Sequence, residues 1–317
     1  MVAVLRRQRR GPILTPSSLP CLGKMPTINL TEGCAHGCVY CYTQGYSGYP
    51  GRERINLFDN IPELVDAELL RKRKEIHRVY FSPSSDAFQP VPEVLDVTFR
   101  TMSILLAQGV QVAMLTKGTV EERFLELFAK FPGKVFAQVG ITTTDERLRS
   151  ALEPNAASVS ERLETIERLM RSGVTVRARL DPLIPDLTDT AENLQPLLAE
   201  LGRRGVRSIA ASYLFVRPAF ARRFSKQLAG IMQVTAAAES WDWHRFADGV
   251  RGGNMIGIEE RQKRFARLAG LAAAADMEMH VCACKNPDLT MSSNCRIAGP
   301  PLPASYPADL PLFQRRQ

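Results

Sequence analysis

The sequence predicts an α/β protein built as an open, partial (β/α)6 TIM-like barrel with a C-terminal extension that carries a second cysteine group. One observation behind this prediction is a regular alternation of short apolar runs with amphipathic stretches through the middle of the chain. Strand patterns that alternate with helix patterns are typical of βαβ units and a parallel sheet. The other observation is that the cysteines gather near the two ends of the chain, with none between Cys41 and Cys282.

The expected elements follow from the spacing of apolar residues. Short apolar strand patterns cover residues 27–30, 78–82, 110–116, 135–142, 174–180, 208–213 and 277–282. Helical patterns cover residues 61–74, 93–107, 120–131, 160–171, 191–203, 221–238 and 258–275. Barrels of this kind carry their chemistry at the carboxyl ends of the strands, so we expect the functional residues in the loops that follow strands.

The chain divides into three expected regions. Residues 1–23 form a basic N-terminal tail, residues 24–220 form the partial barrel, and residues 221–317 form a helical extension that ends in a proline-rich tail. No window approaches the roughly 18 to 20 consecutive apolar residues of a membrane helix, and the N-terminus lacks the order of a signal peptide. We therefore expect a cytoplasmic protein with no membrane partner.

The net charge of +8 is compatible with an anionic partner such as nucleic acid. However, the basic residues are dispersed along the chain, and much of the excess lies in the two tails. The tail residues concerned are Arg6, Arg7, Arg9, Arg10, Arg315 and Arg316. DNA binding is therefore compatible with the sequence but not favoured by it.

The first cysteine group is Cys34, Cys38 and Cys41, on a short loop directly after the first strand. Thiolates at this spacing can converge on one metal centre, and three of them leave one iron of a 4Fe–4S cube without a protein ligand. Such an iron is open to a small molecule. The alternative is a zinc site, which needs a fourth ligand that His36 could supply. Buried cysteines that bind no metal would explain so dense a cluster of three poorly.

The Cys-x3-Cys-x2-Cys pattern, with Tyr40 before its last cysteine, resembles the radical S-adenosylmethionine (SAM) superfamily. The resemblance implies a partial barrel of the radical SAM type and a 4Fe–4S cluster on Cys34, Cys38 and Cys41. It also implies that the open iron chelates SAM and that reductive cleavage gives a 5′-deoxyadenosyl radical, which abstracts hydrogen from a substrate. The implied partners are an electron donor such as flavodoxin or ferredoxin and a small-molecule, peptide or nucleobase substrate.

Further stretches resemble the spore photoproduct lyase-like branch of that superfamily, over roughly residues 24–220. These stretches are SSDAFQPVPE at 84–93, TKG at 116–118, ITTT at 141–144, LEPN at 152–155 and RARLDPLIP at 177–185. The resemblance implies that Ser84, Ser85 and Asp86 lie near SAM's methionine moiety. It implies that Lys117 and Arg179 lie at the barrel mouth as partners for SAM's carboxylate or a substrate anion. Tyr40 completes the implied cofactor-binding set.

Each of these residues also has a plain structural interpretation. Ser-Ser-Asp before Pro-x-Pro is typical of a turn and a helix cap. Lys117 before a glycine is typical of a solvated strand end. Arg179 shares a face of its strand with Arg177, and that face could be the barrel interior or the exterior against helices. Because these residues lie at strand ends, where such barrels carry their chemistry, the functional and the structural interpretations have equal support.

One departure from the branch concerns the hydrogen donor. Spore photoproduct lyase is known for a cysteine inside the barrel that returns a hydrogen atom to the product radical. This chain has no cysteine from residue 42 to residue 281. We therefore expect another donor, such as a tyrosine, or different chemistry, and a substrate other than the thymine dimer of spore DNA. A DNA-repair lyase and a zinc-stabilised nucleic-acid-binding protein remain the alternative functions.

The second cysteine group contains Cys282, Cys284 and Cys295. Together with Cys21, the remaining cysteine, it would make a complete four-thiolate set. The sequence therefore predicts an auxiliary iron–sulfur cluster, with zinc as the alternative because four thiolates suit both metals. Structural cysteines without a metal are the third interpretation. Such a cluster would relay electrons, bind substrate or fix the tail to the barrel.

Overall fold

The computed structural model describes residues 2–17, 22, 25–71, 76–216, 221, 224, 226, 241–244, 253–293, 296 and 299. Most of the helix expected at 221–238 lies outside these residues. Cys21, Cys295 and the proline-rich tail also lie outside the described residues.

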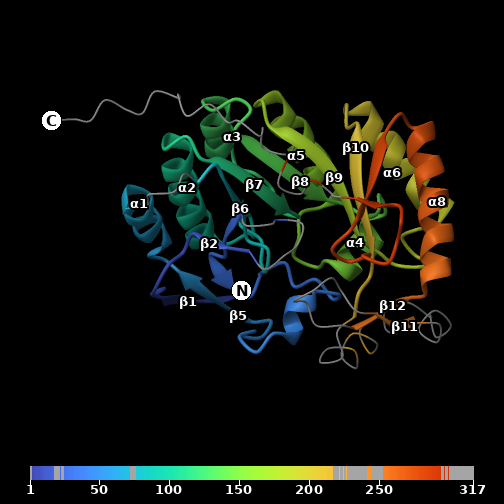
Figure 1. The fold of residues 1–317 in the computed structure, drawn as a ribbon, viewed down its shortest axis with the longest axis horizontal. Coiled ribbons are helices and arrows are strands. Elements are labelled where there is room, and N and C mark those ends of the chain that lie inside the picture. The colour runs from blue at the N-terminus through green and yellow to red at the C-terminus, as the bar shows by residue number, and fades with distance from the viewer. Residues whose placement is uncertain are drawn as a thin grey trace.

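A single large sheet organises the described part of the chain (Figure 1). Its spatial order is β14, β13, β10, β9, β8, β7, β6, β3 and β2. The strands are β2 (Thr15–Pro16), β3 (Pro26–Ile28), β6 (Arg78–Phe81), β7 (Gln111–Thr116), β8 (Val135–Gly140), β9 (Thr175–Leu183), β10 (Ser208–Tyr213), β13 (Glu278–Cys282) and β14 (Ser292–Ser293). Every pair is parallel except β2 with β3. Among the described residues no pairing joins the two edges, so the sheet is open, as the partial barrel requires.

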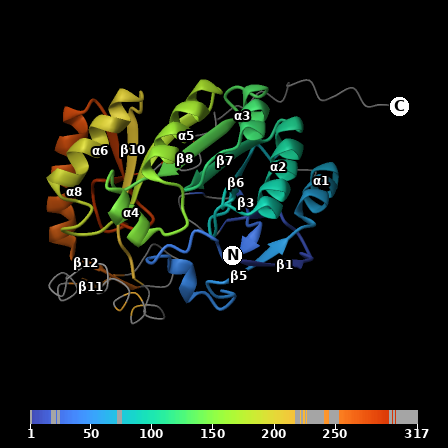
Figure 2. The ribbon, with the colours of Figure 1, turned by 180° about the vertical axis from the view of Figure 1, so that it is seen from behind.

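Helices connect successive parallel strands and follow the sheet along its outer side, as Figures 1 and 2 show. They are α1 (Ile61–Arg71), α2 (Pro92–Ala107), α3 (Glu122–Ala129), α4 (Glu146–Leu152), α5 (Val159–Arg171), α6 (Ala191–Arg203) and α8 (Ile258–Ala274). Local sequence explains their starts: Ser158 and Glu161 form a capping box for α5, and the Asp145 side chain caps α4. The short α4 was not among the expected helices.

The hydrophobic core lies between the sheet and these helices. Strands β6 and β8 are buried along their whole length, because helices cover one face and the site side covers the other. Phe88, Phe124 and Phe128 pack in the core beside α2 and α3, with ring centroids 4.9 Å apart for the first pair. This packing fixes the strands rigidly, so the loops at their carboxyl ends have a firm base.

Two segments within residues 1–23 join sheets. Strand β1 (Ala3–Arg7) pairs in parallel with β5 (Arg54–Phe58), which pairs with β4 (Thr31–Glu32), and β2 pairs with β3. The pattern AVLRR gave little sign of a strand, because four of its five side chains are exposed at a sheet edge. A separate hairpin joins β11 (Trp241–His244) to β12 (Gly253–Ile256).

None of the described helices is long and apolar enough to cross a bilayer.

Candidate functional site

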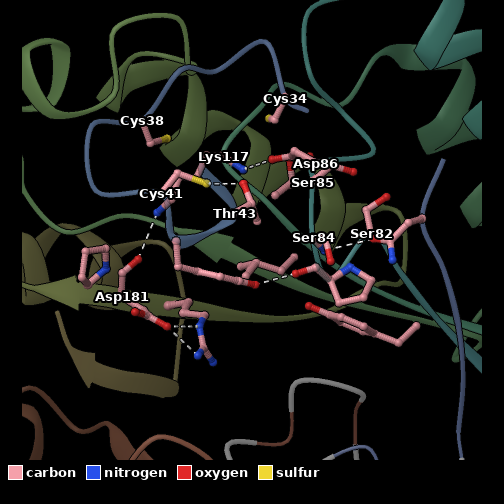
Figure 3. A pocket seen from close by; sticks show the side chains of 18 of the residues that line it. Cys34, Cys38, Cys41, Thr43, Ser82, Ser84, Ser85, Asp86, Lys117 and Asp181 are labelled. Carbon is pink, nitrogen blue, oxygen red and sulfur yellow. Dashed lines mark hydrogen bonds and ion pairs between the residues drawn. The ribbon is translucent and has the colours of Figure 1, made fainter. Parts of the chain in front are cut away.

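A cavity of about 530 Å³ lies at the carboxyl ends of the parallel strands. Its lining comes from the loop after β3, the turns after β6 and β7, the end of β9 and the turn after β13. Figure 3 shows the side chains that enter it from these elements. The position is the one at which barrels of parallel strands carry their active sites.

Cys34, Cys38 and Cys41 all line this cavity (Figure 3). Burial is the main cause that raises the pKa of Cys34, and the charges of Asp86 and the two other thiols add to it. Burial, followed by the charge of Glu153, raises the pKa of Cys38 to about 12. The three thiols thus lie within electrostatic range of one another, and cysteine ligates metal in its deprotonated form. This donor set fits a thiolate-bound cluster.

The cysteine loop is clamped by segments far away in the sequence. The backbone N–H of Ala35 donates to Gln89 Oε1 (2.8 Å), and its carbonyl accepts from Asn155 Nδ2 (3.0 Å). The N–H of Val39 donates to the carbonyl of Leu152 (2.9 Å). The turn after β6 and the segment after α4 therefore set the shape of the loop before any cluster binds.

His36 is the most firmly held side chain of the loop. It is buried, its Nε2 lies 3.0 Å from Asp86 Oδ2, and its Nδ1 lies 3.3 Å from the carbonyl oxygen of Asn155. Asp86 also accepts from Thr116 Oγ1 (2.9 Å) and from the backbone N–H of Lys117 (2.7 Å). Because both ring nitrogens are engaged, His36 is not placed as the fourth ligand that the zinc interpretation needs.

Asp86 therefore has a role that its place in the sequence did not indicate. Burial acts to raise its pKa, but the neighbouring His36 and the backbone donors Lys117 and Phe88 outweigh burial and hold the pKa below its usual range. The carboxylate lines the cavity, and its oxygens bind the loop and the end of β7 (Figure 3). Asp86 thus ties the cysteine loop to the central strands.

A second buried carboxylate holds the other side of the loop. The Tyr40 hydroxyl donates to Glu153 Oε1, and Glu153 also pairs with Lys117 Nζ (3.2 Å) and with Arg162. Glu153 and Arg162 are almost completely buried. Burial would raise the pKa of Glu153, but the charges of Lys117 and Arg162 lower it to about 2. Tyr40, the aromatic residue of the motif, therefore anchors the loop to a charged cluster.

Lys117 crosses from this cluster toward the opposite wall of the cavity. A Cβ atom at Gly140 would lie 2.7 Å from Lys117 Nζ, so the bare backbone of Gly140 makes room for the lysine. The ammonium also donates to the backbone carbonyl of Asp181 (3.2 Å). Lys117 thus lines the cavity between the cysteine loop and β9.

The turn after β6 brings serine hydroxyls into the cavity. Within the described residues, the buried Oγ atoms of Ser82 and Ser85 have no hydrogen-bond partner. Ser82 has a φ of 51°, a left-handed conformation that costs a non-glycine residue energy and is enriched at functional sites. The N–H of Ser84 donates to Asn29 Oδ1 (3.0 Å). Buried hydroxyls that face a cavity without partners fit a polar ligand there.

The wall opposite Tyr40 and Glu153 carries a second charged group. Arg179 Nη2 lies 2.7 Å from Asp181 Oδ2, and Lys285 Nζ lies 2.8 Å from Asp181 Oδ1. Arg179 Nη1 also donates to Gln138 Oε1 (3.2 Å). Burial acts to raise the pKa of Asp181, but Lys285 and Arg179 lower it further than burial raises it. Arg179 therefore faces the barrel interior, where its charge is balanced by a carboxylate.

The second cysteine group reaches this same cavity. Cys282 and Cys284 line it together with the first three cysteines. Cys21 and Cys295 lie outside the described residues, so the structure leaves the expected four-thiolate set a prediction. Within the described parts of the chain, no three His, Cys, Asp or Glu side chains form a site for a single metal ion.

Sequence reasoning missed four residues that contribute to the site. Ser82 was assigned only to a strand, His36 was considered as a zinc ligand, and Asp181 and Lys285 were given no role. Ser82 and Asp181 could have been found from their places at strand ends, and Lys285 from its place beside Cys284. The pairing of His36 with Asp86 had no signal, because 50 residues separate them.

A model of the radical SAM superfamily matches residues 28–195 of this chain. An uncharacterized protein of Methanocaldococcus jannaschii is 27% identical over 195 residues, which are 59% of this chain and 70% of that protein. A radical SAM Nα-GlyT isomerase of Pseudomonas phage M6 is 27% identical over 199 residues, 61% of this chain and 41% of that protein. The match thus spans less than half of the phage enzyme's length.

Solved structures share the fold. A variant of spore photoproduct lyase has a TM-score of 0.70 at 16% identity, covering 88% of this chain and 81% of that chain. Another spore photoproduct lyase variant, with bound AdoMet and dinucleoside spore photoproduct, has a TM-score of 0.69 at 14% identity, with the same two coverages. A radical SAM methyltransferase from Sphaerobacter thermophilus has a TM-score of 0.52 at 19% identity, covering 81% and 65%.

Replacing Glu153 by Gln tests the buried charged cluster. In the folded state its pKa is about 2, below the ordinary 4.5, so its stabilising contribution is present above about pH 4.5 and is lost as pH falls toward 2. We expect Glu153→Gln to lower the free energy of unfolding near neutral pH by about 3–5 kcal/mol, because two buried cations lose their anion. Urea unfolding of the metal-free protein measures this.

Glu126→Gln, the same chemical change at an exposed position of α3, is the matched control and should leave stability within about 0.5 kcal/mol of the wild type. Between about pH 5 and pH 3 the wild type should lose stability more steeply than Glu153→Gln. Equal slopes for the two proteins would contradict the assignment of a stabilising charge to Glu153.

Proposed function

We propose, because this chain belongs to the radical SAM superfamily, that it is an enzyme that holds a 4Fe–4S cluster on Cys34, Cys38 and Cys41 and binds SAM at the open iron. When bound, the cluster and SAM supply reductive cleavage of SAM to methionine and a 5′-deoxyadenosyl radical that abstracts hydrogen from a substrate. The observation that carries the proposal is the set of three thiols on one clamped loop that lines a cavity at the strand ends.

The chain's own residues then divide into two roles. Asp86 and Glu153 hold the cysteine loop, through His36 and Tyr40 respectively. We assign the unpartnered hydroxyls of Ser82 and Ser85 to the polar groups of SAM's methionine moiety, because buried hydroxyls need partners and these line the cavity.

We assign Lys117 as the cation that pairs with SAM's carboxylate. Its ammonium is already fixed between Glu153 and the carbonyl of Asp181, so little side-chain entropy is lost when a carboxylate binds. The Arg179 guanidinium donates hydrogen bonds to Asp181 and Gln138. We assign it to the substrate side of the cavity, where a charged wall suits a substrate with polar groups.

The substrate and partners belong to the same proposal. A small molecule, a peptide or a nucleobase fits the assignment, and the electron would come from a donor such as flavodoxin or ferredoxin. We also propose a second metal centre on the C-terminal cysteine group. The division at residue 220 stays a proposal, and in either case the extension contributes Lys285 and two thiols to the cavity.

The two alternative functions have less support. A lyase acting on DNA is suggested by the spore photoproduct lyase structures, but at 14–16% identity the likeness concerns the fold. A zinc site on the first cysteine group would need His36 as its fourth ligand, and that ring is engaged by Asp86 and Asn155.

The first test of the proposal is iron content and SAM cleavage. Anaerobically reconstituted wild-type protein should hold about four irons at the first site and form 5′-deoxyadenosine when dithionite and SAM are added. Cys38→Ala should lose both properties, because a buried ligand of the cluster is removed. Wild-type protein without dithionite is the control for background cleavage. If Cys38→Ala retains both the cluster and SAM cleavage, the proposal is wrong.

The second test concerns the serine hydroxyls. Ser85→Ala and Ser82→Ala should each raise the dissociation constant of SAM by about 2- to 12-fold, the effect of one hydrogen bond of about 0.5–1.5 kcal/mol. Equilibrium dialysis of SAM against the iron-loaded protein measures this. Ser150→Ala, at an exposed position of α4, is the matched control and should bind SAM like the wild type. Unchanged affinity in both cavity variants would remove these residues from the SAM site.

A further inference from the structure

A threonine hydroxyl lies against the sulfur of the last cysteine of the loop. Cys41 Sγ is 2.9 Å from Thr43 Oγ1, and Figure 3 shows the two side chains facing each other. Thr43 is 6% exposed and lines the same cavity as the three cysteines. A buried hydroxyl is therefore in hydrogen-bond contact with one of the three thiols that the proposed cluster needs.

A short 3₁₀-helix, η2 (Tyr42–Gly45), holds Thr43 in this place. The helix begins directly after Cys41, whose carbonyl accepts from the backbone N–H of Gln44 (3.2 Å). Gln44 Nε2 also donates to the carbonyl of Cys38 (2.9 Å). The helix that carries Thr43 is thus bound to two residues of the cysteine loop.

The neighbours of Thr43 anchor the same helix at both of its ends. The Tyr42 hydroxyl donates to the carbonyl of Pro83 (2.7 Å), in the turn after β6. The carbonyl of Thr43 accepts from the backbone N–H of Tyr46 (3.0 Å), and the rings of Tyr42 and Tyr46 pack edge to face with centroids 5.9 Å apart. These contacts fix the backbone that carries the hydroxyl.

The direction of this hydrogen bond follows from the charge of the sulfur. Between a neutral thiol and a hydroxyl, either atom can be the donor. A cysteine that ligates iron is a thiolate, which has no proton and can only accept. The Thr43 hydroxyl is then the donor, in a charge-assisted hydrogen bond to Cys41.

The Thr43 hydroxyl differs from the other donor in this loop because it belongs to a side chain. The thiol of Cys34 accepts a hydrogen bond from the backbone N–H of His36. A backbone donor of this kind stays in place whichever side chain the residue carries. The hydrogen bond to Cys41 depends on the identity of residue 43, so a substitution can remove it.

Hydrogen bonds to the ligating sulfurs are among the properties that set the reduction potential of an iron–sulfur cluster. Reduction adds negative charge, and a hydrogen-bond donor beside that charge stabilises the reduced state more than the oxidised one. The effect is stronger at a buried position than in water, because the local dielectric constant is lower. A donor at residue 43 therefore raises the potential, which makes the cluster easier to reduce and a weaker reductant.

We propose that the Thr43 hydroxyl donates a hydrogen bond to the Cys41 thiolate and raises the reduction potential of the cluster held by the first cysteine group. The inference rests on the proposed function, because it requires a cluster on Cys34, Cys38 and Cys41. Thr43 acts through Cys41, so the potential is the property that responds to its hydroxyl.

Thr43→Val tests the proposal, because valine keeps the branched shape and lacks the hydroxyl. The potential is measured by electron paramagnetic resonance of the reconstituted cluster at a series of fixed potentials, without SAM. The signal that Cys38→Ala lacks belongs to the first cluster. Thr43→Val should disfavour reduction by about 2- to 12-fold, the effect of one hydrogen bond, which is a negative shift of about 20–60 mV at about 59 mV per tenfold change.

Three further variants separate the hydroxyl from the shape of the side chain. Thr43→Ser keeps the hydroxyl and should stay near the wild-type potential. Thr43→Ala lacks the hydroxyl and is smaller than threonine, so it should shift in the same direction as Thr43→Val and replaces it if Thr43→Val loses its iron. Thr101→Val is the matched control, since the buried Thr101 hydroxyl donates to the carbonyl of Val97 within α2 (2.7 Å), and its potential should equal the wild type's.

Iron content distinguishes failure of this inference from failure of the proposed function. Wild-type protein that holds no cluster after anaerobic reconstitution contradicts the proposed function, and the inference with it. If the wild type, Thr43→Val and Thr43→Ala hold equal iron and share one potential, only the inference is wrong. A negative shift in Thr43→Ser as large as that in Thr43→Val also overturns it, because the hydroxyl would then not set the potential.

Discussion

The site depends on two buried carboxylates, Asp86 and Glu153, that hold the cysteine loop through His36 and Tyr40. Asp86 holds His36 and the end of β7, while Glu153 holds Tyr40 and Lys117. Burying a carboxylate is costly unless it is paired and hydrogen-bonded, and both of these are. Hydrogen bonds to distant segments set the shape of this loop, whose three cysteines line one cavity. The geometry of the loop is therefore determined by contacts within the folded chain.

The parallel sheet turns this local arrangement into a composite site. Successive strands lie side by side in sequence order, so their carboxyl ends meet at one edge. That edge gathers the cysteine loop after β3, serines after β6, a lysine after β7, a charged pair on β9 and the thiols after β13. The helices pack on the other side, and some residues of these loops, such as Ala35 and Phe88, also pack in the core. The C-terminal extension is thereby part of the site.

Much of the fold was predictable because strongly periodic segments dominate it. All six barrel strands and the strand at 277–282 appear where apolar runs indicated them, and six helices match their patterns within a few residues. Strand β1 escaped because its exposed side chains carry no alternation. The three cysteines were predictable from spacing, but the roles of Asp86 and Tyr40 depend on long-range hydrogen bonds that no local pattern encodes. That Cys282 and Cys284 line the same cavity from the extension depends on the order of the strands in the sheet, which no local pattern encodes.

The proposed site requires that three protein thiolates leave one iron open to SAM. Electron–nuclear double resonance of the reduced cluster, with SAM labelled with ¹⁵N in its amino group and ¹⁷O in its carboxylate, tests this requirement. We expect hyperfine coupling of both labels to the cluster, and loss of these couplings along with the cluster in Cys38→Ala. A cluster that forms with SAM present but shows no coupling to either label would rule the proposed site out, because the iron would then have no open position.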